Sequence, residues 1–123
     1  MTAHAGYVTH LYDVDAARIG RAIENIKQAT DKLVQKGKMS NEARSELIGA
    51  LVPTSDLARA ADGVDLVIES APEQMDLKVG LLREVKAIAP EHAILGTNTS
   101  SLSITEIGTR LGAPGRVIGL HFF

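Results

Sequence analysis

Short apolar runs alternate with amphipathic helical patterns along this chain, and this alternation limits the folds open to it. The longest helical pattern places Ile19, Ile23 and Ile26 on one face after Asp15, a residue suited to cap a helix. Strands that alternate with helices predict βα units, and so an α/β, Rossmann-like doubly wound and mostly parallel sheet. The strands are expected within residues 7–12, 51–54, 64–69, 93–97 and 116–120.

Further helices are expected over residues 40–49, 56–63, 74–89 and 104–112. Thr54 or Ser55 is expected to cap the helix over 56–63, and Ser103 or Thr105 to begin the last one. The run over 64–69 is predicted to be a buried strand. In the helix over 74–89, the residues predicted to share one apolar face are Leu77, Leu81, Leu82, Val85 and Ile88.

Composition narrows the class of protein. The 123 residues suit one domain, and a hydrophobic share of 45% favours a folded chain. The formal net charge of −2 gives no support to binding of nucleic acid or of a membrane surface. No apolar run approaches the roughly 20 residues of a membrane helix, and we expect a cytoplasmic protein.

Several kinds of site are disfavoured by residue content. The chain has no cysteine, which excludes disulfides, thiolate metal sites and a cysteine nucleophile. Its four histidines show no metal-ligand spacing, so we expect no metal. The absence of a G-x-S-x-G turn argues against a serine hydrolase.

Polar residues follow the two apolar runs nearest the C-terminus. Thr97-Asn98-Thr99-Ser100-Ser101 follows one run, and His121 follows the other. If the runs are neighbouring parallel strands, both polar ends lie at one sheet edge, where ligands bind in such folds. His121 is then a candidate general base, with Ser100 beside it. The plainer alternatives are a packed histidine and hydroxyls that serve as helix caps or turn residues.

Three charged positions are candidates for ligand binding. Asp13 ends the first strand, where an acidic residue accepts hydrogen bonds from the adenosine ribose, although a turn or helix-cap role is also open. Glu69 and Glu73 flank the loop after the run 64–69, and Glu73 also suits a helix N-terminus. Lys78 could reach an anionic ligand, while by itself the position favours a solvated lysine.

Four motifs in order carry a family resemblance: LYDVD, DLVIESAPEQMDLK, TNTSSLSIT and RVIGLHFF. Together they resemble the NAD-binding domain of the L-3-hydroxyacyl-CoA dehydrogenase family, from about Gly6 to Phe123. The resemblance implies NAD as cofactor, a 3-hydroxyacyl-CoA or 3-ketoacyl-CoA substrate, and a homo-oligomer. The implied cofactor-binding residues are Asp13, Ser70, Ala71, Glu73, Lys78, Asn98 and Ser100, and the implied catalytic residues are His121, Ser100 and Asn98.

The chain also departs from that family's pattern. No G-x-G-x-x-G turn precedes Asp13, and the glutamate and helical domain that the family has after HFF are absent. We therefore expect residues 1–123 to be a partial NAD-binding domain without its first βα unit. If the chain is complete, we expect it to be marginally stable, re-paired or self-associating. The alternatives are a non-catalytic remnant or interaction fragment, and a related dehydrogenase that acts on a free hydroxy acid.

Overall fold

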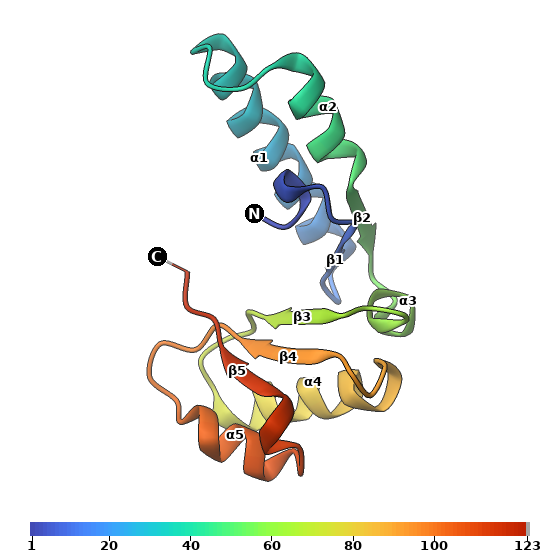
Figure 1. Cartoon of the computed structure of the whole chain (residues 1–123), viewed down its shortest axis with the longest axis vertical. Helices are drawn as coiled ribbons and strands as arrows, with labels where there is room; N and C mark the ends of the chain where they lie inside the picture. The colour runs from blue at the N-terminus through green and yellow to red at the C-terminus, as the bar shows by residue number, and fades with distance from the viewer. Residues whose placement is uncertain (123) are drawn as a thin grey trace. The chain divides into compact units, whose positions relative to one another are not determined.

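The computed structural model of the chain describes residues 1–122, which fall into two compact units. The first unit spans Met1–Ala60, and the second begins at Ala61 (Figure 1). Phe123, the last residue of the HFF motif, lies outside the described residues. Each unit is built around its own parallel strands.

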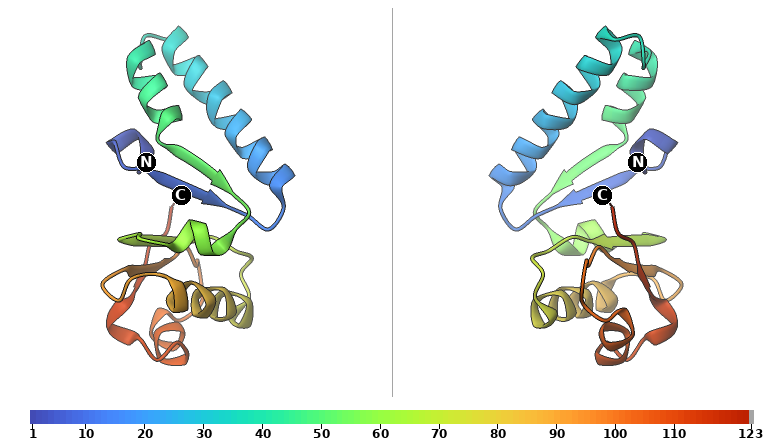
Figure 2. Two further views of the ribbon diagram at one scale, coloured as in Figure 1. Left: turned by 90° about the vertical axis from the view of Figure 1, so that its right-hand side faces the viewer. Right: turned by 90° about the vertical axis from the view of Figure 1, so that its left-hand side faces the viewer.

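The first unit joins two parallel strands to a pair of helices. Strands β1 and β2 pair in parallel from Thr9 opposite Leu51 to Tyr12 opposite Thr54. Figure 2 shows α1 and α2 side by side. In order, the elements are the 3₁₀ turn η1 (Ala3–Ala5), β1 (Thr9–Tyr12), α1 (Ala16–Gln35), α2 (Asn41–Gly49) and β2 (Leu51–Thr54).

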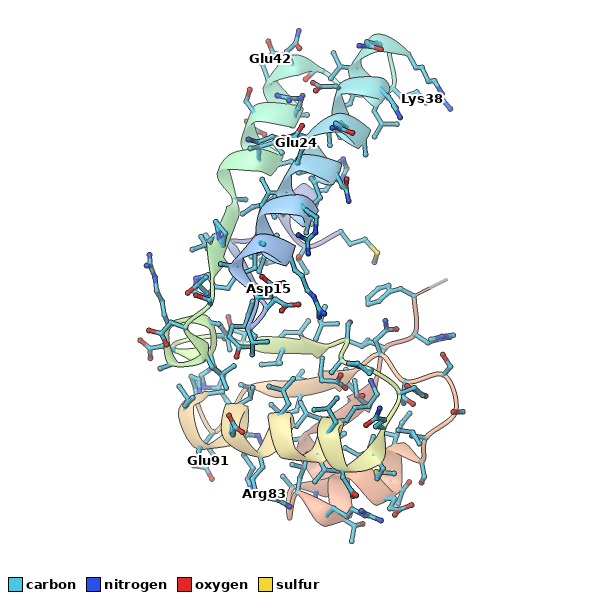
Figure 3. All side chains as sticks on the ribbon, turned by 180° about the vertical axis from the view of Figure 1, so that it is seen from behind. Asp15, Glu24, Lys38, Glu42, Arg83 and Glu91 are labelled. Carbon is cyan, nitrogen blue, oxygen red and sulfur yellow. The ribbon has the colours of Figure 1, made fainter. Side chains whose placement is uncertain are left out.

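Local sequence signals set the ends of these helices. Asp15 caps α1 as predicted, because its side chain accepts a hydrogen bond from the Ala17 amide. Gly37 follows the helix with φ +65°, a left-handed conformation that glycine adopts without a steric penalty. Ser40 caps α2 through the Ala43 amide. Charged side chains such as Glu24 and Glu42 are exposed on these two helices (Figure 3).

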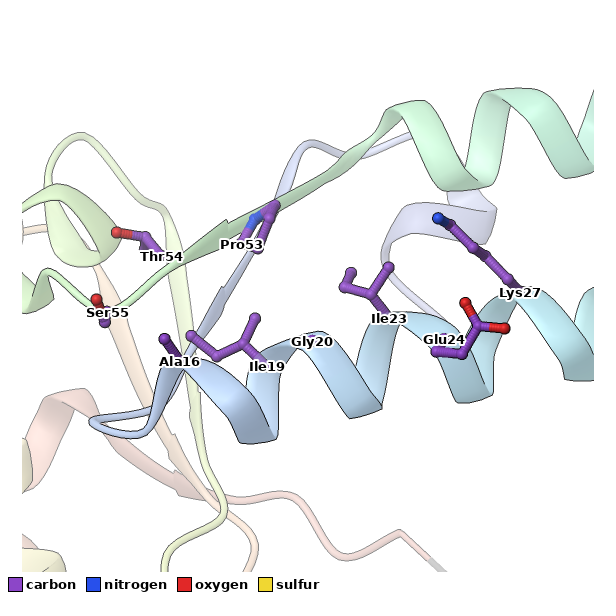
Figure 4. A pocket seen from close by; sticks show the side chains of 9 residues that line it. All are labelled: Ala16, Ile19, Gly20, Ile23, Glu24, Lys27, Pro53, Thr54 and Ser55. Atoms are coloured by element: carbon purple, nitrogen blue, oxygen red, sulfur yellow. The ribbon is translucent and has the colours of Figure 1, made fainter.

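A hollow of about 540 Å³ opens between α1 and β2 (Figure 4). Ile19 and Ile23 of α1 line one side of it, and Pro53 of β2 lines the other. Glu24 and Lys27 are its charged residues. None of the residues that the sequence predicts to be functional lines this hollow.

The second unit is a three-stranded parallel sheet with helices on one face. The strand order is β3-β4-β5, with Glu69 opposite Thr97 and Thr97 opposite Gly119. Helix α3 (Leu57–Ala61) joins the two units in sequence, and Asp56 caps it rather than the predicted Thr54 or Ser55. The elements are β3 (Leu66–Glu69), α4 (Met75–Ile88), β4 (Ile94–Thr97), α5 (Ile104–Arg110), the 3₁₀ turn η2 (Pro114–Arg116) and β5 (Val117–Gly119).

The prediction that the run 64–69 is a buried strand is wrong. Leu66 and Ile68 are 41% and 37% exposed, whereas Leu95 of β4 is fully buried. Helices α4 and α5 both cover the same face of the sheet (Figure 1), and that face takes the alternate residues of each strand. The other face keeps Ile94 and Ile118 partly exposed.

The predicted apolar face of α4 is also partly wrong. Leu77 is 44% exposed and Ile88 is 37% exposed, while Lys78 is completely buried. The buried face includes Leu82 and Val85, and Lys78 extends it by one helical turn. A lysine is tolerated there because Glu69, at the end of β3, supplies the opposite charge.

The α/β class and the parallel arrangement are confirmed. The described strands form one parallel sheet of two and one parallel sheet of three. Strand β2 has the predicted bounds, whereas the other strands are shorter than predicted: β1 begins at Thr9 and β5 covers only Val117–Gly119. Ser103, one of the two predicted starts of α5, caps that helix. Among residues 1–122, no helix has the length and hydropathy required to cross a membrane.

Candidate active site at the ends of β4 and β5

The predicted neighbouring strands are present and bring their polar ends together. Strands β4 and β5 pair in parallel, and the Leu120 amide continues the ladder by donating to the Thr97 carbonyl at 3.0 Å. The two chain segments therefore leave the sheet at the same edge. Asn98 and His121 follow directly, one on each segment.

Ser100 and His121 meet at this edge. The Oγ atom of Ser100 lies 3.0 Å from Nε2 of His121, with the direction of the hydrogen bond set by the imidazole tautomer. Both residues are exposed, so a small molecule can reach them. A hydroxyl beside an imidazole nitrogen can hold a substrate oxygen and exchange a proton with it.

Asn98, which follows β4, is tied to the end of β3 through its backbone and to the segment after β5 through its side chain. Its amide donates to the Glu69 carbonyl at 2.7 Å, which ties it to the end of β3. Its Oδ1 atom accepts a hydrogen bond from the Phe122 amide at 3.0 Å. Asn98 thus fixes the residue that follows His121.

Glu73 organises the loop that carries Ser100. Its Oε1 atom accepts hydrogen bonds from the Thr99 hydroxyl at 2.5 Å, and from the amides of Ser100 and Ser101 at 2.9 and 3.0 Å. The Ser101 hydroxyl donates to the same oxygen at 3.1 Å. The hydrogen bond from Thr99, with those from Ser101 and Ser100, lowers the pKa of Glu73 to about 2. The Glu73 carboxylate therefore holds the Ser100 loop, a role that the sequence did not indicate.

A buried ion pair lies beneath this loop. Nζ of Lys78 lies 3.0 and 3.2 Å from the two carboxylate oxygens of Glu69, and neither side chain is more than 1% exposed. Thr97, also buried, donates its hydroxyl to Oε2 of Glu69 at 2.7 Å. The expectation that Lys78 is solvated, taken on its position alone, is wrong.

The loop between Glu69 and Glu73 is held by the same ion pair. The Ala71 amide donates to Oε1 of Glu69, and the Ala71 carbonyl accepts from Nζ of Lys78 at 2.9 Å. Ser70 is exposed on this loop. The structure therefore gathers Ala71, Glu73 and Lys78 into one network with the Ser100 loop.

Asp13 belongs to the first unit, directly after β1. Its Oδ1 atom accepts a hydrogen bond from the Asp15 amide at 2.8 Å, which is the turn role considered for it. Its Oδ2 atom lies 3.9 Å from an Arg18 guanidinium nitrogen, and the side chain is 33% exposed. Part of the Asp13 side chain thus remains exposed.

The sequence missed the structural importance of Glu69, Thr97 and Thr99. Lys78 lies four residues before Leu82 and seven before Val85, a helical spacing that could have indicated a charge on the buried face. A buried lysine needs a counter-charge, and Glu69 is the acidic residue at the end of the preceding strand. Among residues 1–122, no group of three or more histidine, cysteine or acidic residues could hold a metal ion.

Comparison with known families shows the family to which the chain belongs. Residues 1–123 match the family described as 3-hydroxyacyl-CoA dehydrogenase, NAD binding domain. The chain belongs to this family. The 3-hydroxyacyl-CoA dehydrogenases are NAD-dependent oxidoreductases, and the resemblance noted from the four motifs is therefore confirmed.

Individual 3-hydroxyacyl-CoA dehydrogenase relatives support the same assignment. The chain is 37% identical over its whole length to the 3-hydroxyadipyl-CoA dehydrogenase of Escherichia coli K12, and 34% identical over 98% of its length to a probable 3-hydroxybutyryl-CoA dehydrogenase of Bacillus subtilis. The crystal structure of 3-hydroxybutyryl-CoA dehydrogenase from Escherichia coli K12 matches 99% of the chain with a TM-score of 0.95 and 38% identity. The chain spans 26% of that structure, and 26% and 42% of the two relatives.

Proposed function

We propose that this domain takes part in the reversible oxidation of an L-3-hydroxyacyl-CoA to the 3-ketoacyl-CoA with NAD. The observation that carries the proposal is the 3.0 Å approach of Ser100 Oγ to His121 Nε2 at an exposed sheet edge. Family membership supplies the reaction class. A homo-oligomeric assembly, implied by the family resemblance, and a cytoplasmic location, expected from the sequence, remain part of the proposal.

The residues present fit a dinucleotide cofactor at several points. In the first unit, the partly exposed Asp13 carboxylate can accept hydrogen bonds from the hydroxyls of the adenosine ribose. Exposed Ser70, with Ala71, follows the carboxyl end of β3, and Asn98 follows that of β4, the strand ends at which such folds bind ligands. Oε2 of Glu73 accepts none of the four hydrogen bonds that hold the Ser100 loop. When bound, NAD supplies a hydride acceptor.

The proton chemistry is assigned to His121 and Ser100. In the oxidative direction, Nε2 of His121 takes the proton of the 3-hydroxyl group while hydride leaves the carbon that bears this hydroxyl. The Ser100 hydroxyl donates a hydrogen bond to the same substrate oxygen and keeps it near the imidazole. In the reverse direction, the imidazolium returns the proton to the oxygen of the 3-keto group.

A kinetic experiment tests the proposal on the purified chain. NADH oxidation with acetoacetyl-CoA is measured for the wild type, for His121→Ala and for His92→Ala. His92 is a matched control because its Nε2 also lies 3.0 Å from a polar side-chain atom, Oδ1 of exposed Asp65. We expect His121→Ala to lower kcat by about 10²- to 10⁴-fold, the usual contribution of a general base, and His92→Ala to change it little. Absence of turnover in the wild type, or equal turnover in His121→Ala, would overturn the proposal.

A further inference from the structure

The segments that carry Ser100 and His121 also meet at a second place, beside the catalytic pair. Ile104 begins α5, four residues after Ser100. Gly119 ends β5, two residues before His121. Helix α5 packs against β5 (Figure 1), and the Ile104 side chain lies against Gly119. One contact therefore joins the chain that follows Ser100 to the chain that leads to His121.

Gly119 leaves the space that the Ile104 side chain fills. A Cβ atom at position 119 would overlap Cδ1 of Ile104 and would lie 3.3 Å from its Cγ1 atom. Rotation of the terminal methyl group relieves only the first of these contacts, because Cγ1 keeps its place unless χ1 changes. A β-branched side chain in a helix strongly prefers one χ1 rotamer, so a side chain at position 119 would push α5 and β5 apart.

Neighbouring contacts determine where such a displacement goes. Gly119 pairs with Thr97, a completely buried residue of β4, so β5 is held by the sheet. Ser103 caps α5 and fixes the backbone directly before Ile104 to the first turn of the helix. A push at Gly119 therefore moves the start of α5 together with the chain before it, and that chain carries Ser100.

We propose that Ile104 and Gly119 are positioning residues, whose close contact sets the distance between Ser100 and His121. The inference deepens the proposed function and rests on it for the identity of the catalytic pair. Its physical basis is that a closely packed contact has low compressibility, so a change of volume at one residue displaces the segments on both sides.

An exchange of side-chain size tests the inference by NMR of the whole, isotope-labelled chain. Proton–nitrogen correlation spectra report the imidazole nitrogens, and Ser100→Ala supplies the position of the His121 Nε2 resonance without the serine hydroxyl. We expect Gly119→Ala to move this resonance most of the way to that position. Ile104→Val removes Cδ1, the overlapping atom, so the Gly119→Ala, Ile104→Val chain should return the resonance to its wild-type position. The His92 resonances are the internal reference and should not move.

Two matched controls separate this fit from a general loss of stability. Gly115→Ala adds the same methyl group where a Cβ atom meets no atom within 4 Å. Ile118→Ala is matched to Ile104→Ala, because the two isoleucines are 40% and 39% exposed and Ile118 lies on the other face of β5. Both controls should leave the His121 resonance in place. Ile104→Ala, which empties the space beside Gly119, should shift it.

Steady-state kinetics with acetoacetyl-CoA and NADH measure the catalytic consequence. A misplaced base slows the chemical step and leaves substrate binding intact, so Gly119→Ala should lower kcat about 10- to 100-fold with little change in KM. The Gly119→Ala, Ile104→Val chain should recover most of this loss. A domain that was merely destabilised would not be rescued by a second substitution that removes a further methyl group.

The outcomes distinguish the inference from the proposed function. An unchanged His121 resonance in Gly119→Ala or in Ser100→Ala would overturn the inference, as would failure of Ile104→Val to restore it. If Gly119→Ala does not fold, Ile104→Ala decides, and an unchanged resonance in that variant contradicts the inference. If the wild-type chain does not oxidise NADH, the proposed function fails, and the spectra still decide whether the Ile104–Gly119 contact aligns Ser100 with His121.

Discussion

The Nε2 atom of His121 lies 3.0 Å from the Oγ atom of Ser100, although the two residues are 21 positions apart in sequence. Parallel pairing of β4 with β5 brings them together, since parallel strands end at the same sheet edge. Glu73 holds the Ser100 side of the pair and Asn98 holds the His121 side. The catalytic geometry thus depends on residues from three segments of the second unit.

Removal of the Ser100 hydroxyl should impair the reaction without unfolding the domain. Ser100→Ala loses the hydrogen bond to His121 and, in the proposed reaction, the one to the substrate oxygen. We expect kcat/KM to fall about 10- to 100-fold, with little change in stability because Ser100 is exposed. Steady-state kinetics and thermal unfolding provide the two measurements.

Ser103→Ala is the matched control for that substitution. The Ser103 side chain accepts a hydrogen bond from the Glu106 amide and caps α5. Its loss should lower the free energy of unfolding by about 1 kcal/mol while kcat/KM is retained. The assignment of Ser100 would be contradicted if the two serine variants had the same kinetic effect.

A side chain at Gly96 should strain the sheet next to the site. A Cβ atom there would lie 2.7 Å from Cδ1 of Leu120 and 2.8 Å from the Val67 carbonyl oxygen. The carbonyl belongs to a paired strand and cannot move away cheaply, so Gly96→Ala should destabilise the domain by about 1–3 kcal/mol. Urea denaturation measures this loss.

Gly80→Ala should have the opposite effect on stability in the same urea denaturation experiment. Gly80 lies inside α4, and a Cβ atom there meets no atom within 4 Å. Alanine favours helix by about 0.5–1 kcal/mol over glycine, so this variant should be stabilised. Equal effects of the two substitutions would show that the close packing of Leu120 over Gly96 is absent in solution.

Stability should depend on pH through Glu73. Its pKa falls from an ordinary 4.5 to about 2 in the folded chain because the carboxylate accepts hydrogen bonds, first from Thr99. The folded state therefore binds the proton less well than the unfolded state. The stabilisation by Glu73 is present above about pH 4.5 and is lost as the pH falls through about 2.

Comparison with Glu73→Gln isolates this contribution. Denaturant unfolding of both chains across the acidic range should show a wild-type advantage at neutral pH that shrinks between pH 4.5 and 2. An advantage that is constant across this window would mean that the carboxylate does not hold the Thr99–Ser101 loop as a charged acceptor.

The buried ion pair should show strong coupling in a double-mutant cycle. Lys78→Met leaves the buried Glu69 carboxylate uncompensated and should cost about 3–5 kcal/mol of unfolding free energy. Glu69→Gln with Lys78→Met should cost clearly less than the two single changes added together, since it removes both charges. Additive losses in urea denaturation would show that the two side chains do not interact.

Much of the local structure is set by interactions between residues that are only a few positions apart in the sequence. The caps at Asp15 and Ser103, and the positive-φ turn at Gly37, are set by side-chain chemistry and backbone sterics, and all three were predictable. The pairing of β4 with β5 was also predictable, because βα alternation leaves parallel neighbours as the simplest arrangement. Hence the sequence alone indicated the Ser100–His121 pair.

Only the tertiary structure decided which charges are buried and which apolar residues remain at the surface. Helical periodicity assigned Leu77 to the core, and the position of Lys78 taken alone favoured a solvated lysine. The fold does the reverse because Glu69 lies under the first turn of α4. Burial of an ammonium group depends on a partner supplied by another element, and no local pattern reports that partner. The sequence by itself determined the elements, their parallel order and the family. Packing of these elements then creates the contacts that hold the Ser100 loop, which join Glu69, Glu73 and Lys78.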